Sequence, residues 1–159
     1  MDMIEIQSQQ SFQAAVHAAV REALLQRARR LVLLDEDYEP WALDDPALLD
    51  DLTAFARLPG RTILIIGRRF EGLARRCPRF VAWRRTWGHA VEVRRPVDDE
   101  ARCPTLLLVD RAWAVELLDR VRWRGRVSQN DPRTVILADE VDAFAQRTEP
   151  TFGVTTLGL

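Results

Sequence analysis

Lysine is absent from this chain of 159 residues, in which all 23 basic residues are arginine. The chain therefore has no side chain for Schiff-base chemistry and lacks the phosphate-binding lysine of a Walker loop. It also contains no Gly-x-Ser-x-Gly sequence and no glycine-rich phosphate loop. These absences argue against a serine hydrolase of the nucleophile-elbow type and against a P-loop nucleotide enzyme.

Cysteine and histidine are scarce, with two of each in the whole chain. Cys77 and Cys103 lie too far apart in the sequence to indicate a disulfide scaffold, and neither pairs with His17 or His89 at zinc-site spacing. We therefore predict two reduced, half-buried thiols. The sequence indicates no metal site and no cofactor.

Long apolar runs are missing as well. No stretch approaches the roughly 18 residues that indicate a membrane-spanning helix. The first ten residues carry two acids and no basic region, unlike a secretory signal. We expect a cytoplasmic protein with no membrane partner. With 47% hydrophobic residues, the chain can form one core, and we expect a single domain over residues 1–159.

Helix and strand patterns alternate through the first 95 residues. Ser11 is the expected cap of the first helix, and Asp45-Pro46 combines an N-cap residue with a proline at the first helical position. The expected order is helix 12–30, strand 31–34, helix 46–58, strand 62–66, a helix broken at Pro78, and strand 90–94. This alternation predicts parallel β-α-β units with right-handed crossovers.

The remaining residues follow a different pattern. Strands are expected at 105–110, 113–117 and 121–127, and their short connections predict antiparallel ribbons. Asp131-Pro132 should open a last helix that ends near residue 147, with Val135, Ala138 and Val141 facing inward. The tail 149–159 is expected to be extended over the surface. The predicted fold class is α/β, with one mixed sheet that is parallel in the N-terminal half and antiparallel in the C-terminal half.

Charge is segregated along the chain although the net charge is only −1. Residues 35–51 contain eight acids and no basic residue, whereas residues 57–95 contain eleven arginines and two acids. Arginine binds phosphate and carboxylate groups through its planar guanidinium. This segregation indicates either an anionic ligand, such as nucleic acid, or internal pairing between the two segments.

A second basic feature lies near the C-terminal ribbons. At strand spacing, one face of the expected ribbon carries Arg120, Arg122, Arg124 and Arg126. The opposite face would then anchor Val121, Trp123 and Val127 in the core. Four like charges at this spacing repel one another, so they require an anionic ligand, solvent or the acidic segment to offset them.

Asp35 and Asp37 follow an apolar strand in the order Asp-x-Asp, which resembles the start of the haloacid-dehalogenase-like phosphatases. In that family the first aspartate attacks phosphorus and the second handles the leaving-group proton. Here the next strand ends in Gly67-Arg68 without the family's serine or threonine. A metal-dependent phosphotransferase centred on these two aspartates is one alternative. The other interpretation is that Asp35, Glu36 and Asp37 begin a loop and balance nearby arginines.

The order of elements and the strand that ends in Asp110 resemble one half of the phospholipase D superfamily. Each half of those enzymes contributes a His-x-Lys-(x)4-Asp motif on a strand, and the two histidines act as nucleophile and acid on a phosphodiester. When the motif aspartate is aligned with Asp110, Cys103 replaces the histidine and Thr105 replaces the lysine. The segment Ser128-x-Asn130 is similar to the Gly-Ser-x-Asn that follows the motif in active members.

The chain also resembles a bacterial group of short, degenerate phospholipase D-like domains. The features compared are strand 31–35, Pro78-Arg79, Asp131-Pro132 and the ending Leu157-Gly158-Leu159. Because the histidine and lysine are missing, this resemblance implies a non-catalytic binding or assembly module rather than an enzyme. Phospholipase D-like halves pair, and the chain has five tryptophans, a residue type enriched at interfaces. We therefore expect a homodimer or another protein partner.

The candidate ligand-binding residues are the arginines near the predicted strand ends and the motif aspartate: Arg68, Arg69, Arg120, Arg122, Arg124, Arg126 and Asp110. No residue is assigned a catalytic or metal-binding role. The interpretations that stay open are an assembly module, a phosphate or nucleic-acid binder that uses its arginine faces, and the metal-dependent phosphotransferase.

Overall fold

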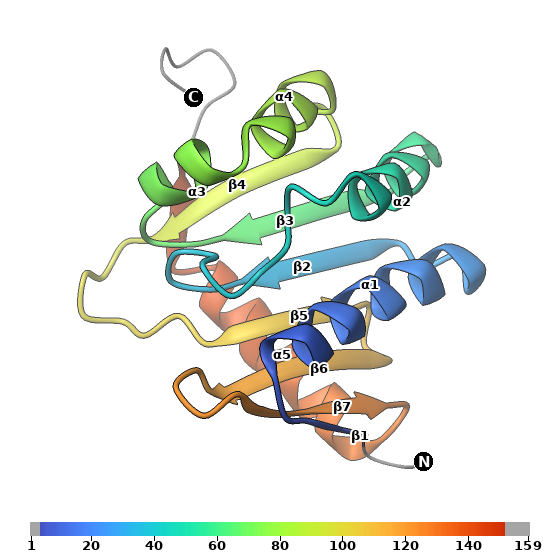
Figure 1. Ribbon diagram of the computed structural model, residues 1–159, viewed down its shortest axis with the longest axis vertical. Helices are drawn as coiled ribbons and strands as arrows, with labels where there is room; N and C mark the ends of the chain where they lie inside the picture. The colour runs from blue at the N-terminus through green and yellow to red at the C-terminus, as the bar shows by residue number, and fades with distance from the viewer. Residues whose placement is uncertain (1–3, 152–159) are drawn as a thin grey trace.

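The computed structural model describes residues 4–151, which form one mixed sheet of eight strands with helices on both faces (Figure 1). The strands are β1 (Ile4–Ile6), β2 (Arg30–Leu34), β3 (Thr62–Ile66), β4 (Val91–Pro96), β5 (Thr105–Val109), β6 (Trp113–Asp119), β7 (Arg124–Gln129) and β8 (Thr148–Pro150). The helices are α1 (Gln9–Leu25), α2 (Pro46–Arg57), α3 (Glu71–Arg76), α4 (Pro78–Thr86) and α5 (Pro132–Ala145). The strand order across the sheet is β1-β7-β6-β5-β2-β3-β4-β8.

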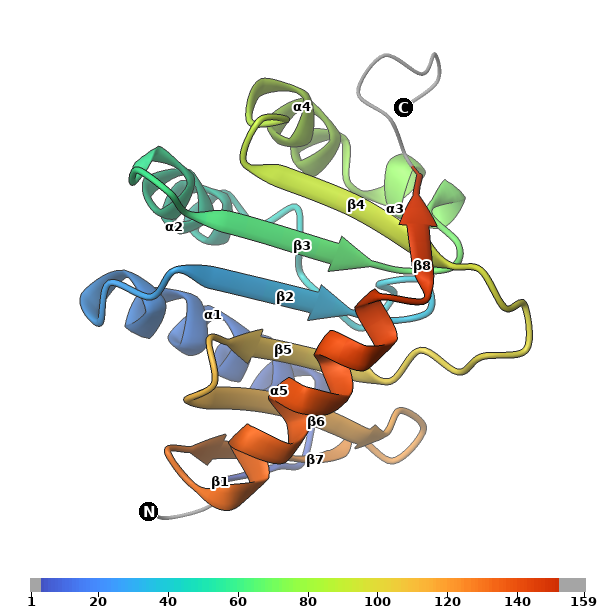
Figure 2. The same ribbon diagram turned by 180° about the vertical axis from the view of Figure 1, so that it is seen from behind.

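The predicted mixture of strand directions is confirmed. Strands β2, β3 and β4 are parallel, whereas β5, β6 and β7 form antiparallel pairs and β5 joins β2 in antiparallel register. Helices α1 to α4 cover one face of the sheet (Figure 1), and α5 crosses the other face diagonally (Figure 2). Residues 31–34 of β2 are buried on both faces, as their aliphatic run predicts.

Helix α1 begins and ends earlier than the sequence pattern predicts. Its N-cap is Ser8, and the predicted cap Ser11 is instead the reciprocal partner within a capping box. At the other end Arg27 adopts a left-handed conformation with φ of 54°, and the N–H of Ala28 bonds to the carbonyl of Ala23. This is the hydrogen bond of a Schellman motif. It ends the helix before the arginine cluster and frees Arg30 to begin β2.

The prediction that four arginines share one strand face after β6 is wrong. Residues 120–123 form a turn rather than part of a strand, because the Asp119 carboxylate accepts the N–H groups of Val121 and Arg122, both at 3.0 Å. Trp123 then has a φ of 55°. Val121, expected in the core, is 89% exposed. The four arginines therefore do not share one strand face.

The first strand and the last helix also depart from expectation. Strand β1, which pairs with β7, has only three residues and carries no recognisable sequence pattern. On α5 the buried side includes Thr134, Leu137, Ala138 and Val141, whereas Val135 is exposed. The predicted extended tail is present as far as β8, and the similarity at Leu157-Gly158-Leu159 lies outside the described residues. Within residues 4–151 no helix has the length and apolar character to cross a membrane.

Candidate functional site

The candidate site lies at the carboxyl ends of the parallel strands β2 and β3, and we call this side of the sheet the Asp35 edge. Because β5 runs antiparallel to β2, its first residue is at the same edge, beside the acidic segment 35–39. The turn between β6 and β7 and the connection from β4 to β5 also lie on this side (Figure 1). Segments distant in the sequence thus meet around the first residue after β2, Asp35.

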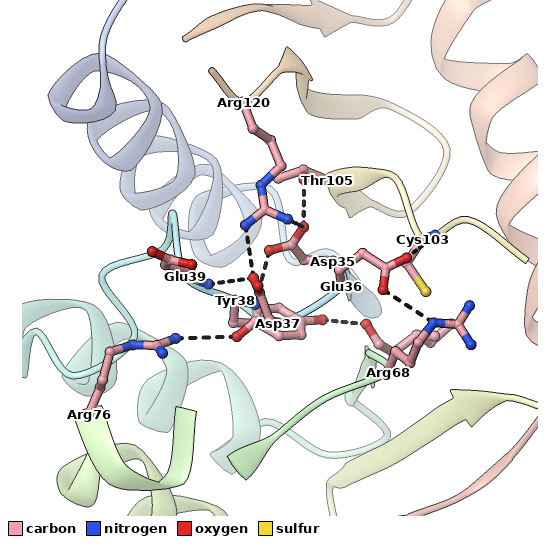
Figure 3. Close-up of polar contacts among 11 residues, drawn as sticks. Asp35, Glu36, Asp37, Tyr38, Glu39, Arg68, Arg76, Cys103, Thr105 and Arg120 are labelled. Carbon is pink, nitrogen blue, oxygen red and sulfur yellow. Dashed lines mark hydrogen bonds and ion pairs between the residues drawn. The ribbon is translucent and has the colours of Figure 1, made fainter. Parts of the chain in front are cut away.

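The Asp35 carboxylate is fully buried and has three polar partners (Figure 3). One oxygen accepts the Thr105 hydroxyl at 2.5 Å and lies 3.6 Å from the Arg120 guanidinium. The other oxygen accepts the backbone N–H of Tyr38 at 3.0 Å. Burial without such partners would be very unfavourable for a carboxylate, so these contacts fix the conformation of the loop.

Tyr38 anchors the acidic loop to the core. Its hydroxyl donates to the carbonyl of Ile66 at 2.7 Å, and its ring packs against Trp41 and Phe70. The residue has a φ of 61°, a strained value for a bulky side chain, which the surrounding contacts compensate. Gly67 lies so close that a Cβ there would be 3.0 Å from the Tyr38 ring. The acidic loop is therefore a packed element.

Arg120 bridges the two aspartates of the Asp-x-Asp sequence. It donates to Asp37 at 2.8 Å and lies beside Asp35, so one guanidinium serves both carboxylates. The geometry supports the interpretation in which these acids balance arginines. Within residues 4–151, no group of three or more histidine, cysteine or acidic side chains has an arrangement suited to a metal ion.

Glu36 forms a second ion pair at this edge. Its carboxylate accepts from the Arg68 side chain at 3.2 Å and from the backbone N–H of Cys103 at 3.1 Å. Arg68 also donates to the carbonyls of Asp98 and Ala101, which fastens the connection between β4 and β5. The two positions aligned with the phospholipase D histidine and lysine, Cys103 and Thr105, are thus both held by acidic residues that follow β2.

Burial controls the ionisation of these groups. It raises the pKa of Asp35 above its ordinary value of 3.8, although Thr105 and Arg120 act in the opposite direction. Burial also acts to raise the pKa of Asp37, but hydrogen bonds from Glu39 and Arg120 outweigh it, and the pKa falls below 3.8. Desolvation, reinforced by the Glu36 charge, raises the pKa of the Cys103 thiol to about 12. This thiol is therefore neutral at physiological pH and is not an activated nucleophile.

The structure brings together only some of the residues singled out from the sequence. Arg68 and Arg120 contact the acidic loop through their side chains, and Arg69 does so through its N–H, which bonds to the carbonyl of Glu36 at 2.9 Å. The exposed Arg122 lies in the neighbouring turn. The sequence patterns did not reveal how Glu36 is used, because a carboxylate within an acidic run carries no signal of its partner.

The remaining predicted residues lie elsewhere. Arg126 pairs with the buried Glu116 at 2.9 Å, and Arg133 of α5 shares that carboxylate at 2.7 Å. Arg124 donates to backbone carbonyls, including that of Gln7 at 3.4 Å. These contacts distribute the predicted arginine face among separate partners.

Asp110 lies at the far end of β5, away from the acidic loop. Its carboxylate accepts the backbone N–H groups of Arg29 and Arg30, at 3.1 and 2.9 Å, and its φ is 48°. These bonds join the end of β5 to the beginning of β2. The structure gives Asp110 a strand-joining role and does not place it in one cleft with Arg68 and Arg120.

The fold has known counterparts. Nuc from Salmonella typhimurium, a phospholipase D family member, is similar with a TM-score of 0.60 and 11% identity, over 96% of this chain and 99% of that chain. NucT from Helicobacter pylori gives a TM-score of 0.55 and 8% identity, over 94% and 99% of the two chains. These likenesses confirm the predicted phospholipase D-like fold.

A third counterpart is TrmBL2, an archaeal chromatin protein whose structure shows a novel mode of DNA binding. Its TM-score is 0.60 with 16% identity, over 95% of this chain. The present chain spans about half of TrmBL2, 54% of its length. The sequence itself matches no protein-family model and no curated protein. Identities this low establish the fold alone.

Asparagine variants of the two aspartates should change the pH dependence of stability in opposite directions. Since the pKa of Asp35 is raised in the folded state, folding loses stability as the pH rises from 3.8 towards that raised pKa. The lowered pKa of Asp37 instead contributes stability that is present above 3.8 and lost as the pH falls through the lowered pKa.

Between about pH 3 and about pH 7, the stability of Asp35→Asn should therefore rise relative to that of the wild type, and the stability of Asp37→Asn should fall relative to it. Urea unfolding of the three proteins across this range measures both differences. If both variants change in the same direction relative to the wild type, the assignment of the buried and the paired carboxylate is wrong.

Proposed function

We propose that this chain is a degenerate phospholipase D-like domain that works in the cytoplasm as a non-catalytic binding or assembly module. The proposal rests on the contacts of Cys103 and Thr105, the residues aligned with the histidine and the lysine of the family motif. Both are incorporated into the hydrogen-bonded network of Asp35 and Glu36. The two free, buried cysteines of the described chain agree with a reducing compartment.

The chemistry available at this edge supports the proposal. The Cys103 thiol is neutral, and the Thr105 hydroxyl donates its proton to a buried carboxylate. His17 lies on α1, where it contacts Asp51 at 2.9 Å, and His89 lies before β4 at the opposite end of the strands. A phosphodiester at this edge would thus meet no imidazole nucleophile.

The metal-dependent phosphotransferase receives less support. A metal ion between Asp35 and Asp37 would have to take the place of the Arg120 guanidinium, which already supplies the positive charge there. Asp35 also has both oxygens engaged by Thr105 and Tyr38. An available, partly hydrated carboxylate pair is what Mg²⁺ chemistry requires.

Phosphodiesterase assays test the absence of catalysis. Purified protein should not hydrolyse bis-p-nitrophenyl phosphate or phosphatidylcholine above the rate in buffer, with or without Mg²⁺, because the motif's nucleophile is missing. Thr105→Val serves as the matched variant, since it keeps the side-chain shape and removes the hydroxyl. Turnover in the wild type that disappears in a folded Thr105→Val protein would contradict the proposal.

The same edge has the features of an interface between two copies of the chain. It exposes Leu118 and Val121, 60% and 89% accessible, beside a cavity of about 320 Å³ bordered by Val121, Trp123 and Glu39. Such a surface can be self-complementary about a two-fold axis, because the protruding side chain of each copy can enter the cavity of the other. Exposed Glu39 and Arg122 add opposite charges to this surface. We therefore take a second copy as the partner.

Sedimentation tests this assembly. At roughly 50 μM, a concentration that populates a micromolar dimer, the protein should sediment at twice its 18.3 kDa mass. Leu118→Glu combined with Val121→Glu should yield monomers, because buried unpaired carboxylates oppose association. Leu25→Glu is the control, since Leu25 is 77% exposed at the opposite edge and should not affect the dimer. A wild-type protein that is monomeric at this concentration contradicts the proposed homodimer.

Nucleic-acid binding is the second candidate. The favouring observation is a set of exposed arginines on or just before α3 and α4: Arg69, Arg75, Arg76, Arg79 and Arg85. The fold also resembles that of TrmBL2, for which DNA binding is described. An arginine-rich surface of this kind suits a phosphate backbone and needs no base-specific contact.

Fluorescence anisotropy with duplex and single-stranded DNA tests this candidate. Phosphate contacts predict that affinity falls steeply, by about 100-fold or more, between roughly 50 mM and 200 mM salt. Arg75→Gln with Arg85→Gln should weaken binding, whereas Arg21→Gln with Arg111→Gln, which removes the same charge elsewhere, should have a smaller effect. Equal losses in the two double variants would show that net charge, rather than the α3–α4 surface, determines the affinity.

A further inference from the structure

Arg84, near the end of α4, is a buried arginine with two guanidinium nitrogens that lack a hydrogen-bond partner. The residue is only 7% exposed, and its Nε and Nη1 atoms have no acceptor in the structure. By contrast, the half-buried arginines near Asp35, Arg68 and Arg120, contact carboxylates. A buried, unpaired guanidinium is strongly unfavourable, and proteins normally pair such a charge.

A cavity of about 550 Å³ lies beside this arginine. It is formed around the amino ends of β3 and β4, where the sheet edge is open because β8 pairs with β4 only from Arg94 to Pro96. Apolar lining comes from Leu64 and Val91. The cavity has the size and the mixed lining of small-molecule sites. It lies at the opposite end of the strands from the Asp35 network.

The charged groups that line the cavity favour an anion. Arg84 and Arg30 are cationic, and Glu92 is the one acid among the described lining residues. Glu92 is already paired with Arg94 at 2.6 Å. Arg30 is paired with Asp142 at 2.7 Å, which leaves Arg84 as the charge without a partner. Burial lowers the pKa of Arg84, but arginine stays cationic at neutral pH.

We propose that this cavity binds a small molecule through an oxyanion, a carboxylate or a phosphate, that pairs with the buried guanidinium of Arg84. Charge-assisted hydrogen bonds from Arg84 would satisfy its open donors, and Leu64 and Val91 would contact the apolar part of the molecule. The hydroxyl groups of Thr62 and Thr151, which also line the cavity, offer further polar contacts. The inference is independent of catalysis, dimerisation and nucleic-acid binding at the other surfaces.

Thermal unfolding with sodium phosphate and with sodium succinate tests the site and distinguishes the two anion classes. At least one of these salts should raise the Tm of the wild type above that in sodium chloride of equal ionic strength. Arg84→Met should abolish the extra increase and weaken calorimetrically measured binding by about tenfold or more, the effect of losing one charged hydrogen bond. Without added anion, Arg84→Met should melt no lower than the wild type, because it removes an unpaired buried charge.

Arg85→Met is the matched control, since Arg85 is the exposed neighbour on the same helix and should retain the anion response. General salting effects of phosphate act on all three proteins alike and cancel in the comparison. Wild-type NMR adds a readout that needs no variant: the Arg84 Nε–H resonance should move on addition of the effective anion. An equal response in wild type and Arg84→Met, an unmoved Arg84 resonance, or no response beyond chloride in the wild type would overturn the proposal.

Discussion

The buried carboxylate of Asp35 is the interaction on which the arrangement of this edge depends. It lies at the end of β2, in the centre of the sheet. Because it has no access to water, its oxygens need hydrogen-bond or ion-pair partners from the protein. Thr105 connects it to β5, Arg120 connects it to the turn after β6, and the N–H of Tyr38 folds the acidic loop back over the strand end. A single buried acid therefore fixes the relative positions of three segments that are distant in the sequence.

The phospholipase D-like fold forms here with Cys103 and Thr105 at the positions aligned with the motif's histidine and lysine. The fold depends on the aliphatic strands, the caps of the helices and polar junctions such as the one that Asp110 makes with the start of β2. None of these requires the histidine or the lysine of the motif. Position 105 instead supplies a hydroxyl that stabilises a neighbouring carboxylate. The fold of this chain therefore does not depend on the residues of that motif.

The charge segregation has a structural explanation as well. Acids of the 35–51 segment contact the basic surroundings: Glu36 meets Arg68, and Asp44 accepts the backbone N–H of Arg79 at 2.8 Å. Some of these arginines are therefore paired with acids of the 35–51 segment, Arg68 with Glu36 and Arg79 with Asp44, at modest net gain for the more exposed pair. Arg84 differs from this pattern, because it is buried beside a cavity and no acid of the described chain reaches it. A buried guanidinium that faces a cavity and has no acidic partner is the feature that points to a ligand.

The sequence by itself determined the helix starts and the central strand, which depend only on residues close together in the chain. The aliphatic run at 31–34 predicts a central strand, and Asp45-Pro46 and Asp131-Pro132 predict the starts of α2 and α5, because capping and burial on both faces are local properties. Tertiary structure alone decided which charges meet. Arg120 and Asp37 are 83 positions apart, and only the pairing of β5 with β2 places them in contact. The burial of Arg84 escaped the sequence patterns for the same reason, since side-chain periodicity does not encode the distant groups that surround a residue. The turn at 120–123 was missed although its cause is local, because the strand-like alternation hid the turn that Asp119 makes with the N–H groups of Val121 and Arg122.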